Sequence, residues 1–345
     1  MQISEIDAQL AARGARTQHR NRVLRHWLQG IPLSQGRRPL QHFLPKPLFE
    51  ALPGLMAAWQ GLVQLHTREP AADGSERLLL TLGDGQSVEA VLLPQREKAW
   101  GLCVSSQVGC AVGCGFCMTG TGGLIRQLTS GEILAQVVLA RSLRPVNKVV
   151  FMGMGEPSHN LEAVWSAIQL LGSEGGIGHK NLVFSTVGDE RAFARLLEGP
   201  VKPALALSLH TTRAELRERL LPRAPRISPQ TLVALADAYA RASGYPVQYQ
   251  WTLLDGVNDD EEDAIVALLK DRFGVLNLIP FNTVPGLPFS RPDAERSRAL
   301  LRRLHSRGIL TKLRDSAGQD VEGGCGQLRA RIQVERPLRF QPSGT

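Results

Sequence analysis

The sequence predicts an α/β protein built on a parallel β-sheet, either open or closed into a barrel. Six apolar runs typical of buried strands recur in the chain, and segments with helical periodicity lie between them. Polar or glycine-rich residues end each run, and in parallel α/β folds these strand ends share the face that binds ligands. Six distant motifs are therefore expected to converge on one pocket. The runs span residues 100–105, 147–155, 181–188, 203–210, 247–256 and 275–282.

Helices are expected before this sheet. Residues 17–30 carry apolar side chains at helical spacing among arginines, and Gly30 ends this helix. Residues 45–59 predict a second short helix, which breaks near Pro53. Together these segments predict a small helical unit at the N-terminus.

A β-hairpin is expected next, over residues 76–94, because two apolar runs flank the turn dipeptide Asp84-Gly85. Within the α/β region, residues 130–143 form the clearest helix. Thr129 and Glu132 are spaced as a capping box at its start. A second clear helix is expected over residues 228–243.

The composition of the 345-residue chain narrows its class. No apolar run is long enough to cross a bilayer, and the first residues lack the apolar core of a signal peptide. Five cysteines, four of them between residues 103 and 117, argue against a disulfide framework. We therefore expect a cytoplasmic protein with no membrane partner.

The net charge of +8 gathers at the two ends of the chain. Residues 1–50 hold eight Lys/Arg against three Asp/Glu, and residues 291–345 hold twelve against six. Residues 51–290 hold twenty against twenty-three. Any single arginine is more simply a solvated surface group, but two basic ends around a near-neutral body favour binding to a polyanion.

Cys110, Cys114 and Cys117 form a C-x3-C-x2-C motif on a glycine-bearing loop. A structural zinc site needs four protein ligands, and no second CxxC pair supplies the fourth. A [4Fe–4S] cluster held by three cysteines leaves one iron open to bind a substrate. Three buried cysteines without a metal remain the simple alternative. We favour the cluster because of the spacing and the glycines.

The motifs resemble those of one family. The cluster loop C-x3-C-x-F-C is similar to that of radical S-adenosylmethionine (SAM) enzymes. With the two outlying cysteines, the whole set resembles the RlmN/Cfr family of RNA adenosine methyltransferases, from about Gln18 to Leu328. The motifs are CVSSQVGCAVGCGFCMTGTGG, VVFMGMGEPSHNL, ALSLH, LLDGVND, LIPFNTVPG and CGQL.

This resemblance implies a fold and its divisions. The fold is a partial (β/α)6 TIM-like barrel of the radical SAM type, with a small N-terminal helical domain and a β-hairpin extension. The implied divisions are an RNA-binding helical domain (1–72), the hairpin extension (73–95), the core barrel (96–320), and a C-terminal catalytic-cysteine loop with a basic tail (321–345).

The resemblance also implies cofactors and partners. The cofactors are a [4Fe–4S] cluster, held by Cys110, Cys114 and Cys117, and SAM. The substrate is an aromatic carbon of an adenosine in rRNA or tRNA, with C2 favoured over C8, and not DNA. An electron donor such as flavodoxin or ferredoxin would reduce the cluster.

Individual roles follow from the same resemblance. Cys325 carries the methyl group, Cys103 releases the product by forming a disulfide, and Glu89 accepts the ring proton. Taken alone, Glu89 would be a solvated strand residue, Cys103 a buried thiol and Cys325 an exposed loop thiol. The positions that match SAM contacts are Gly155, Glu156, Ser185, Ser208, Leu209, His210 and Asn282.

Two segments depart from the family pattern, STVGDER after the third strand and AGQDVEGGCGQL at the last cysteine. Both are expected near the entry of the substrate RNA, so they leave the identity of that RNA open. Two other functions stay open as well: a radical SAM enzyme acting on another RNA, a peptide or a small molecule, and a non-catalytic RNA-binding protein with a structural metal.

Overall fold

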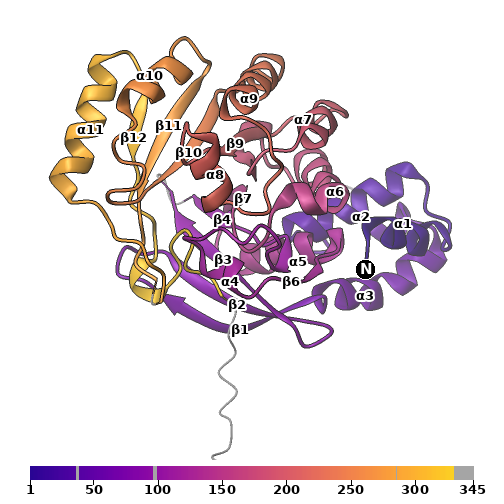
Figure 1. Cartoon of the computed structure of the whole chain (residues 1–345). Coiled ribbons are helices and arrows are strands. Elements are labelled where there is room, and N and C mark those ends of the chain that lie inside the picture. The colour runs from indigo at the N-terminus through magenta and orange to yellow at the C-terminus, as the bar shows by residue number, and fades with distance from the viewer. Residues whose placement is uncertain (36–38, 96–98, 285, 330–345) are drawn as a thin grey trace, which may run out of the picture.

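The structure, a computed structural model, describes residues 1–35, 39–95, 99–284 and 286–329. Its central feature is a mixed ten-stranded sheet, in which antiparallel strands β1 to β4 continue into parallel strands β4 and β7 to β12 (Figure 1). Neighbours in the sheet follow the order of the chain. Its strands are β1 (Val63–Pro70), β2 (Glu76–Leu82), β3 (Ser87–Pro94), β4 (Trp100–Cys103), β7 (Val146–Phe151), β8 (Leu182–Thr186), β9 (Ala204–Ser208), β10 (Val247–Leu253), β11 (Gly274–Pro280) and β12 (Thr311–Leu313).

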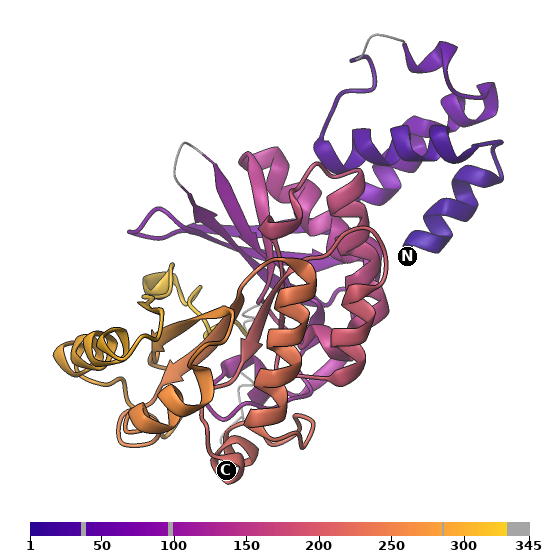
Figure 2. The same ribbon diagram turned by 90° about the horizontal axis from the view of Figure 1, so that it is seen from above.

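The parallel part confirms the predicted partial barrel. Each predicted strand is present, and helices cover the outer face of the curved sheet (Figure 2). Strand β12 was not predicted, because only three residues of a short polar segment pair with β11. The covering helices are α5 (Ser130–Leu143), α6 (Leu161–Ser173), α7 (Glu190–Leu197), α8 (Ala214–Leu220), α9 (Pro229–Ser243), α10 (Glu262–Leu269) and α11 (Ala294–Ser306).

Three N-terminal helices form a separate group that packs on the barrel through α5 (Figure 2). They are α1 (Ile3–Ala11), α2 (Thr17–Gln29) and α3 (Lys46–Gln60). Helix α1 was not predicted. The predicted break at Pro53 is wrong, since α3 runs through it; Pro53 lies on the exposed face of the helix. The segment after α3 forms strand β1, which was not predicted, because its mostly exposed side chains give no alternating apolar pattern.

Local signals of the sequence are confirmed where they were strongest. The hairpin β2–β3 turns at Gly85, which has a φ of 82°. Helix α5 begins with the expected capping box, in which Thr129 Oγ1 accepts from the N–H of Glu132 and the Glu132 carboxylate accepts from the N–H of Thr129. In the described part of the chain, no helix is both long and apolar enough to span a bilayer.

The chain between β12 and residue 329 crosses back over the antiparallel strands. Two reciprocal hydrogen bonds tie it to the β1–β2 turn: the N–H of Gly318 donates to Asp73 (2.9 Å), and the N–H of Ala72 donates to Asp320 (2.8 Å). Further along, a Cβ on Gly323 would lie 3.7 Å from Val91 of β3. The segment that carries the last cysteine therefore rests on the hairpin face, although about 250 residues separate the two in sequence. The remaining short elements are β5 (Gln107–Gly109), β6 (Leu124–Gln127), α4 (Met118–Thr121) and the 3-10 turns Leu40–His42, Pro157–Asn160, His179–Asn181 and Gln319–Val321.

Candidate active site

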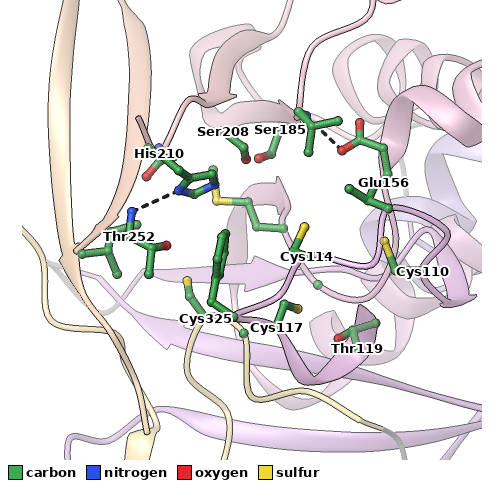
Figure 3. A pocket seen from close by; sticks show the side chains of 18 of the residues that line it. Cys110, Cys114, Cys117, Thr119, Glu156, Ser185, Ser208, His210, Thr252 and Cys325 are labelled. Carbon is green, nitrogen blue, oxygen red and sulfur yellow. Dashed lines mark hydrogen bonds between the residues drawn. The ribbon is translucent and has the colours of Figure 1, made fainter. Parts of the chain in front are cut away.

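A cavity opens at the carboxyl ends of the parallel strands, on the predicted face of the sheet. Five strands (β7 to β11), the cysteine loop and the C-terminal segment contribute to its wall, which brings together residues from 110 to 326 (Figure 3). Ten of the residues singled out in the sequence line it: Cys110, Cys114, Cys117, Gly155, Glu156, Ser185, Ser208, His210, Asn282 and Cys325.

The three cysteines of the C-x3-C-x2-C motif share one end of this cavity (Figure 3). Their loop is tightly folded: the N–H of Cys117 donates to the carbonyl of Cys114, and a Cβ on Gly120 would lie 3.0 Å from the N of Cys114. Burial raises the pKa of Cys110 to about 12, and burial with the neighbouring thiols also raises the pKa of Cys114. Binding of a metal centre here must therefore release protons from the thiols.

Gly155 and Glu156 form a rigid corner beside these cysteines. Gly155 has a φ of 103°, and a Cβ there would lie 2.6 Å from the side chain of Gln107, so only glycine fits. The buried Glu156 carboxylate accepts from two backbone N–H groups, those of Ser158 and Val187, each at 3.0 Å. The side chain is thus fixed in one orientation at the cavity wall.

His210 is held as a neutral imidazole on the opposite side of the cavity (Figure 3). Its Nδ1 accepts a hydrogen bond of 3.0 Å from the N–H of Thr252, so the hydrogen of the neutral ring is on Nε2. Burial, aided by the charge of Arg217, lowers its pKa to about 3. His210 can therefore donate a hydrogen bond to a ligand but does not act as a cation near neutral pH.

Asn282 and Cys325 meet at the mouth of the cavity. The amide of Asn282 donates to the carbonyl of Cys325 (2.9 Å) and to the hydroxyl of Ser316 (2.8 Å). The Oδ1 of Asn282 is buried and has no partner among the described residues, so it is available to a ligand. Cys325 is exposed toward the cavity, with Cys117 within electrostatic range. Loss of solvent around the Cys325 thiol raises its pKa, although a hydrogen bond with Ser316 and the charge of Arg314 act in the opposite direction.

Cys103 and Glu89 lie outside the lining of this cavity, on the adjoining face of the antiparallel strands. Cys103 pairs with Val91, and Glu89 is two residues from Val91 on the same face of β3. Burial and the nearby Cys325 raise the pKa of Cys103, which places the two sulfurs within electrostatic range. The Glu89 carboxylate accepts from Arg77 (3.1 Å) and from the N–H of Arg329 (2.8 Å).

The site fits a cluster and SAM by three observations. Three thiols line one wall, the buried Oδ1 of the lining residue Asn282 has no hydrogen-bond partner in the described part of the chain, and the lining residue His210 keeps its Nε2–H for a ligand because its Nδ1 is bonded to Thr252. Within residues 1–35, 39–95, 99–284 and 286–329, no three His, Cys, Asp or Glu side chains converge on a single metal ion. A four-iron cluster has a different requirement, because each cysteine binds a different iron.

Comparison with known proteins agrees with this geometry. Residues 104–269 match the radical SAM superfamily. A probable RNA methyltransferase of Methylibium petroleiphilum is 63% identical over the whole chain and 98% of its own length, and one of Bordetella avium is 64% identical over 96% and 94%. A crystal structure of a radical SAM methyltransferase from Sphaerobacter thermophilus superposes with a TM-score of 0.81 at 34% identity, covering 96% of this chain and 98% of that one. The chain belongs to the RlmN/Cfr-like family of radical SAM methyltransferases. Its cofactors are accordingly a [4Fe–4S] cluster and SAM.

Some expectations for this methyltransferase need correction or stay predictions. The side chain of Leu209 is fully buried in the core and does not line the cavity, so only its backbone could reach SAM. All five cysteines are free thiols, so the disulfide expected during product release is absent from this state. The roles of the individual site residues and the domain boundaries stay predictions.

Sequence reasoning missed several cavity residues. Gln250 and Thr252 of β10 line the cavity, and their alternation with apolar residues in a buried parallel strand was a signal that could have found them. Arg217 of α8 is buried behind the cavity wall, but charged residues occur all around this short helix and give no signal.

The basic ends of the methyltransferase are only partly available to a polyanion. Most arginines of α11 pair with carboxylates, among them Arg296 with Asp255 and Asp259, and Arg303 with Glu262. Residues 330–345, which contain the predicted basic tail, lie outside the described residues, as do residues 36–38.

Proposed function

We propose that this enzyme methylates an aromatic carbon of an adenosine in RNA, C2 in preference to C8, with rRNA or tRNA as the substrate. The printed names of relatives more than 60% identical over nearly the whole chain, probable RNA methyltransferases, support RNA as the substrate class. An aromatic ring carbon of adenine is a poor nucleophile, so direct attack on the SAM methyl group is unfavourable. A cavity that combines a cluster site with additional thiols offers a different route.

We assign the cluster to Cys110, Cys114 and Cys117, and SAM to the wall formed by Gly155, Glu156, Ser185, Ser208, His210 and Asn282, with Leu209 contributing only backbone. When bound, these cofactors supply the one-electron chemistry that removes a hydrogen atom from a methyl group. The protein orients the ligand: His210 Nε2 donates a hydrogen bond, and Asn282 Oδ1 accepts one. A one-electron donor of the flavodoxin or ferredoxin type would deliver the electron.

The two remaining thiols complete the transfer in this proposal. Cys325 takes a methyl group from one SAM molecule, which leaves as S-adenosylhomocysteine. After loss of a hydrogen atom, this carbon bonds to the adenine ring carbon. Glu89 then accepts the ring proton, and the surplus electron would return to the cluster. The thiolate of Cys103 attacks the Cys325 sulfur, so the S–S bond forms as the sulfur–carbon bond breaks, and the released carbon takes a proton. A dithiol reductant must then reduce the disulfide, which fits a cytoplasmic enzyme.

One observation carries the proposal: Cys325 faces the cavity of the three clustered cysteines and is also within electrostatic range of Cys103. The proposed methyl transfer explains why a fourth and a fifth thiol, Cys325 and Cys103, lie close to each other, with Cys325 facing the three cluster cysteines. Glu89 supports the same assignment, because the N–H of Arg329 ties it to the segment that carries Cys325.

The test is to trap the RNA on the protein. Anaerobically reconstituted Cys103→Ala enzyme, supplied with SAM, reductant and RNA, is expected to accumulate a covalent protein–RNA adduct, because the resolving thiol is missing. The double variant Cys103→Ala/Cys325→Ala is the control and should form none. Turnover by Cys103→Ala without any adduct would show that Cys103 does not resolve the intermediate.

A further inference from the structure

Arg217 is a buried cation that the assignments above leave without a role. Its side chain lies in α8 and is only 3% exposed. Its Nη2 donates to the carbonyls of Val187 and Ser208, at 3.2 Å for Ser208, and both of these residues line the active-site cavity. The guanidinium therefore lies directly behind the cavity wall.

The charge of Arg217 is poorly compensated within the protein. Its Nε has no hydrogen-bond partner in the described part of the chain, and no carboxylate there forms an ion pair with it. This contrasts with Arg213, at the start of the same helix, which pairs with Glu261 at 3.1 Å. A buried cation without a directly paired carboxylate is costly, so its presence indicates that further negative charge is expected nearby.

The geometry shows where that anion would be. Arg217 interacts electrostatically with Cys114 and Glu156. Val187 lies between Arg217 and Glu156, because the Val187 N–H donates to the Glu156 carboxylate and the Val187 carbonyl accepts from Arg217. Burial lowers the pKa of Arg217 to about 10, so it stays protonated at neutral pH. Cysteine binds iron as thiolate, and cluster assembly therefore brings negative charge to the position that Arg217 faces.

We propose that Arg217 is the fixed counter-charge of the iron–sulfur cluster and raises its reduction potential. Reduction adds one negative charge to the cluster, and a buried cation favours the more negative state. The effect is strong here because the guanidinium is buried and bonded to two residues of the cavity wall, so solvent screens its charge little. Arg217 is thus a positioning residue that acts on the cluster through its charge, and this inference rests on the assignment of Cys110, Cys114 and Cys117 as ligands.

The test compares midpoint potentials in the full-length reconstituted enzyme without SAM, so that cofactor affinity does not contribute. We expect a negative shift in Arg217→Met and a potential close to wild type in Arg217→Lys, which keeps the charge. Arg219→Met is the control, because it removes an equal but exposed charge from the same helix and should leave the potential unchanged. An electron paramagnetic resonance titration measures all four proteins.

Each result decides the inference. An unchanged potential in Arg217→Met, or an equal fall in the Met and Lys variants, would show that Arg217 only fastens Val187 and Ser208. If Arg217→Met retains no cluster, recovery of the cluster and its potential in Arg217→Lys supports the charge, and failure of both variants overturns it. Wild-type protein without any four-iron signal would instead refute the proposed function itself.

Discussion

The buried His210 gives a quantitative prediction for the pH dependence of stability. The pKa of this residue is about 3 in the folded protein and about 6.5 when unfolded, because burial and the nearby Arg217 disfavour the imidazolium. Between these values the unfolded chain binds a proton that the folded protein does not. Stability is therefore lost as the pH falls from 6.5, by up to about 1.4 kcal/mol for each pH unit from this one group. Above pH 6.5, His210 contributes no pH dependence.

The substitution His210→Gln removes this titration while its side-chain oxygen can still accept from the N–H of Thr252. We expect the free energy of unfolding to fall less steeply with acid in His210→Gln than in wild type, by about one bound proton between pH 4.5 and 6. Urea unfolding of the apoprotein at a series of pH values measures this slope. His66→Gln, in the exposed strand β1, is the control for loss of a histidine and should follow wild type. Parallel curves for wild type and His210→Gln would refute a neutral buried imidazole.

Two further predictions concern glycine and the C-terminal segment. Gly155→Ala should lower the free energy of unfolding by about 2–3 kcal/mol and weaken SAM binding, because the added Cβ would meet Gln107. The control is Gly85→Ala, where φ is also positive but the Cβ would meet no atom. It should lower the free energy of unfolding by only about 1 kcal/mol in the same urea experiment. Equal losses would argue against the close approach. Asp73→Ala should slow RNA methylation several-fold but spare formation of 5′-deoxyadenosine, the fragment that one-electron cleavage of SAM would release. The reason is that the bond from Gly318 to Asp73 helps to place Cys325. Asp293→Ala, which removes a helix cap on α11 instead, should leave the ratio of the two products unchanged, and a similar fall in that ratio would contradict the positional role.

The parts of the fold that the sequence predicts are those specified by local chemistry. The turn at Gly85 and the cap at Thr129 depend on a few adjacent residues, and apolar strand runs identify the parallel sheet. Strand β1 could not be found, since its exposed side chains have no period, and the continuity of α3 through Pro53 depends on which face of the helix meets solvent.

The site divides in the same way. The cysteine spacing and the rule that parallel strands end on one face predict the cavity and most of its lining. The bonds that hold Cys325 on the hairpin, and the burial of Arg217 behind Ser208, depend on tertiary contacts between segments far apart in the chain. Leu209 was included in the site because it belongs to a site motif, but its side chain lies in the core. A motif does not show which of its side chains point away from the cavity.

The most direct test of the account is nucleoside mass spectrometry of rRNA and tRNA from a strain that lacks this gene, compared with its parent. We predict that one methyladenosine present in the parent is missing from the deletion strain. A plasmid with the wild-type gene should restore it, and one encoding Cys325→Ala should not. Identical nucleoside profiles in parent and deletion strain, or full restoration by Cys325→Ala, would contradict the claim that a methyl group passes from Cys325 to an adenine ring.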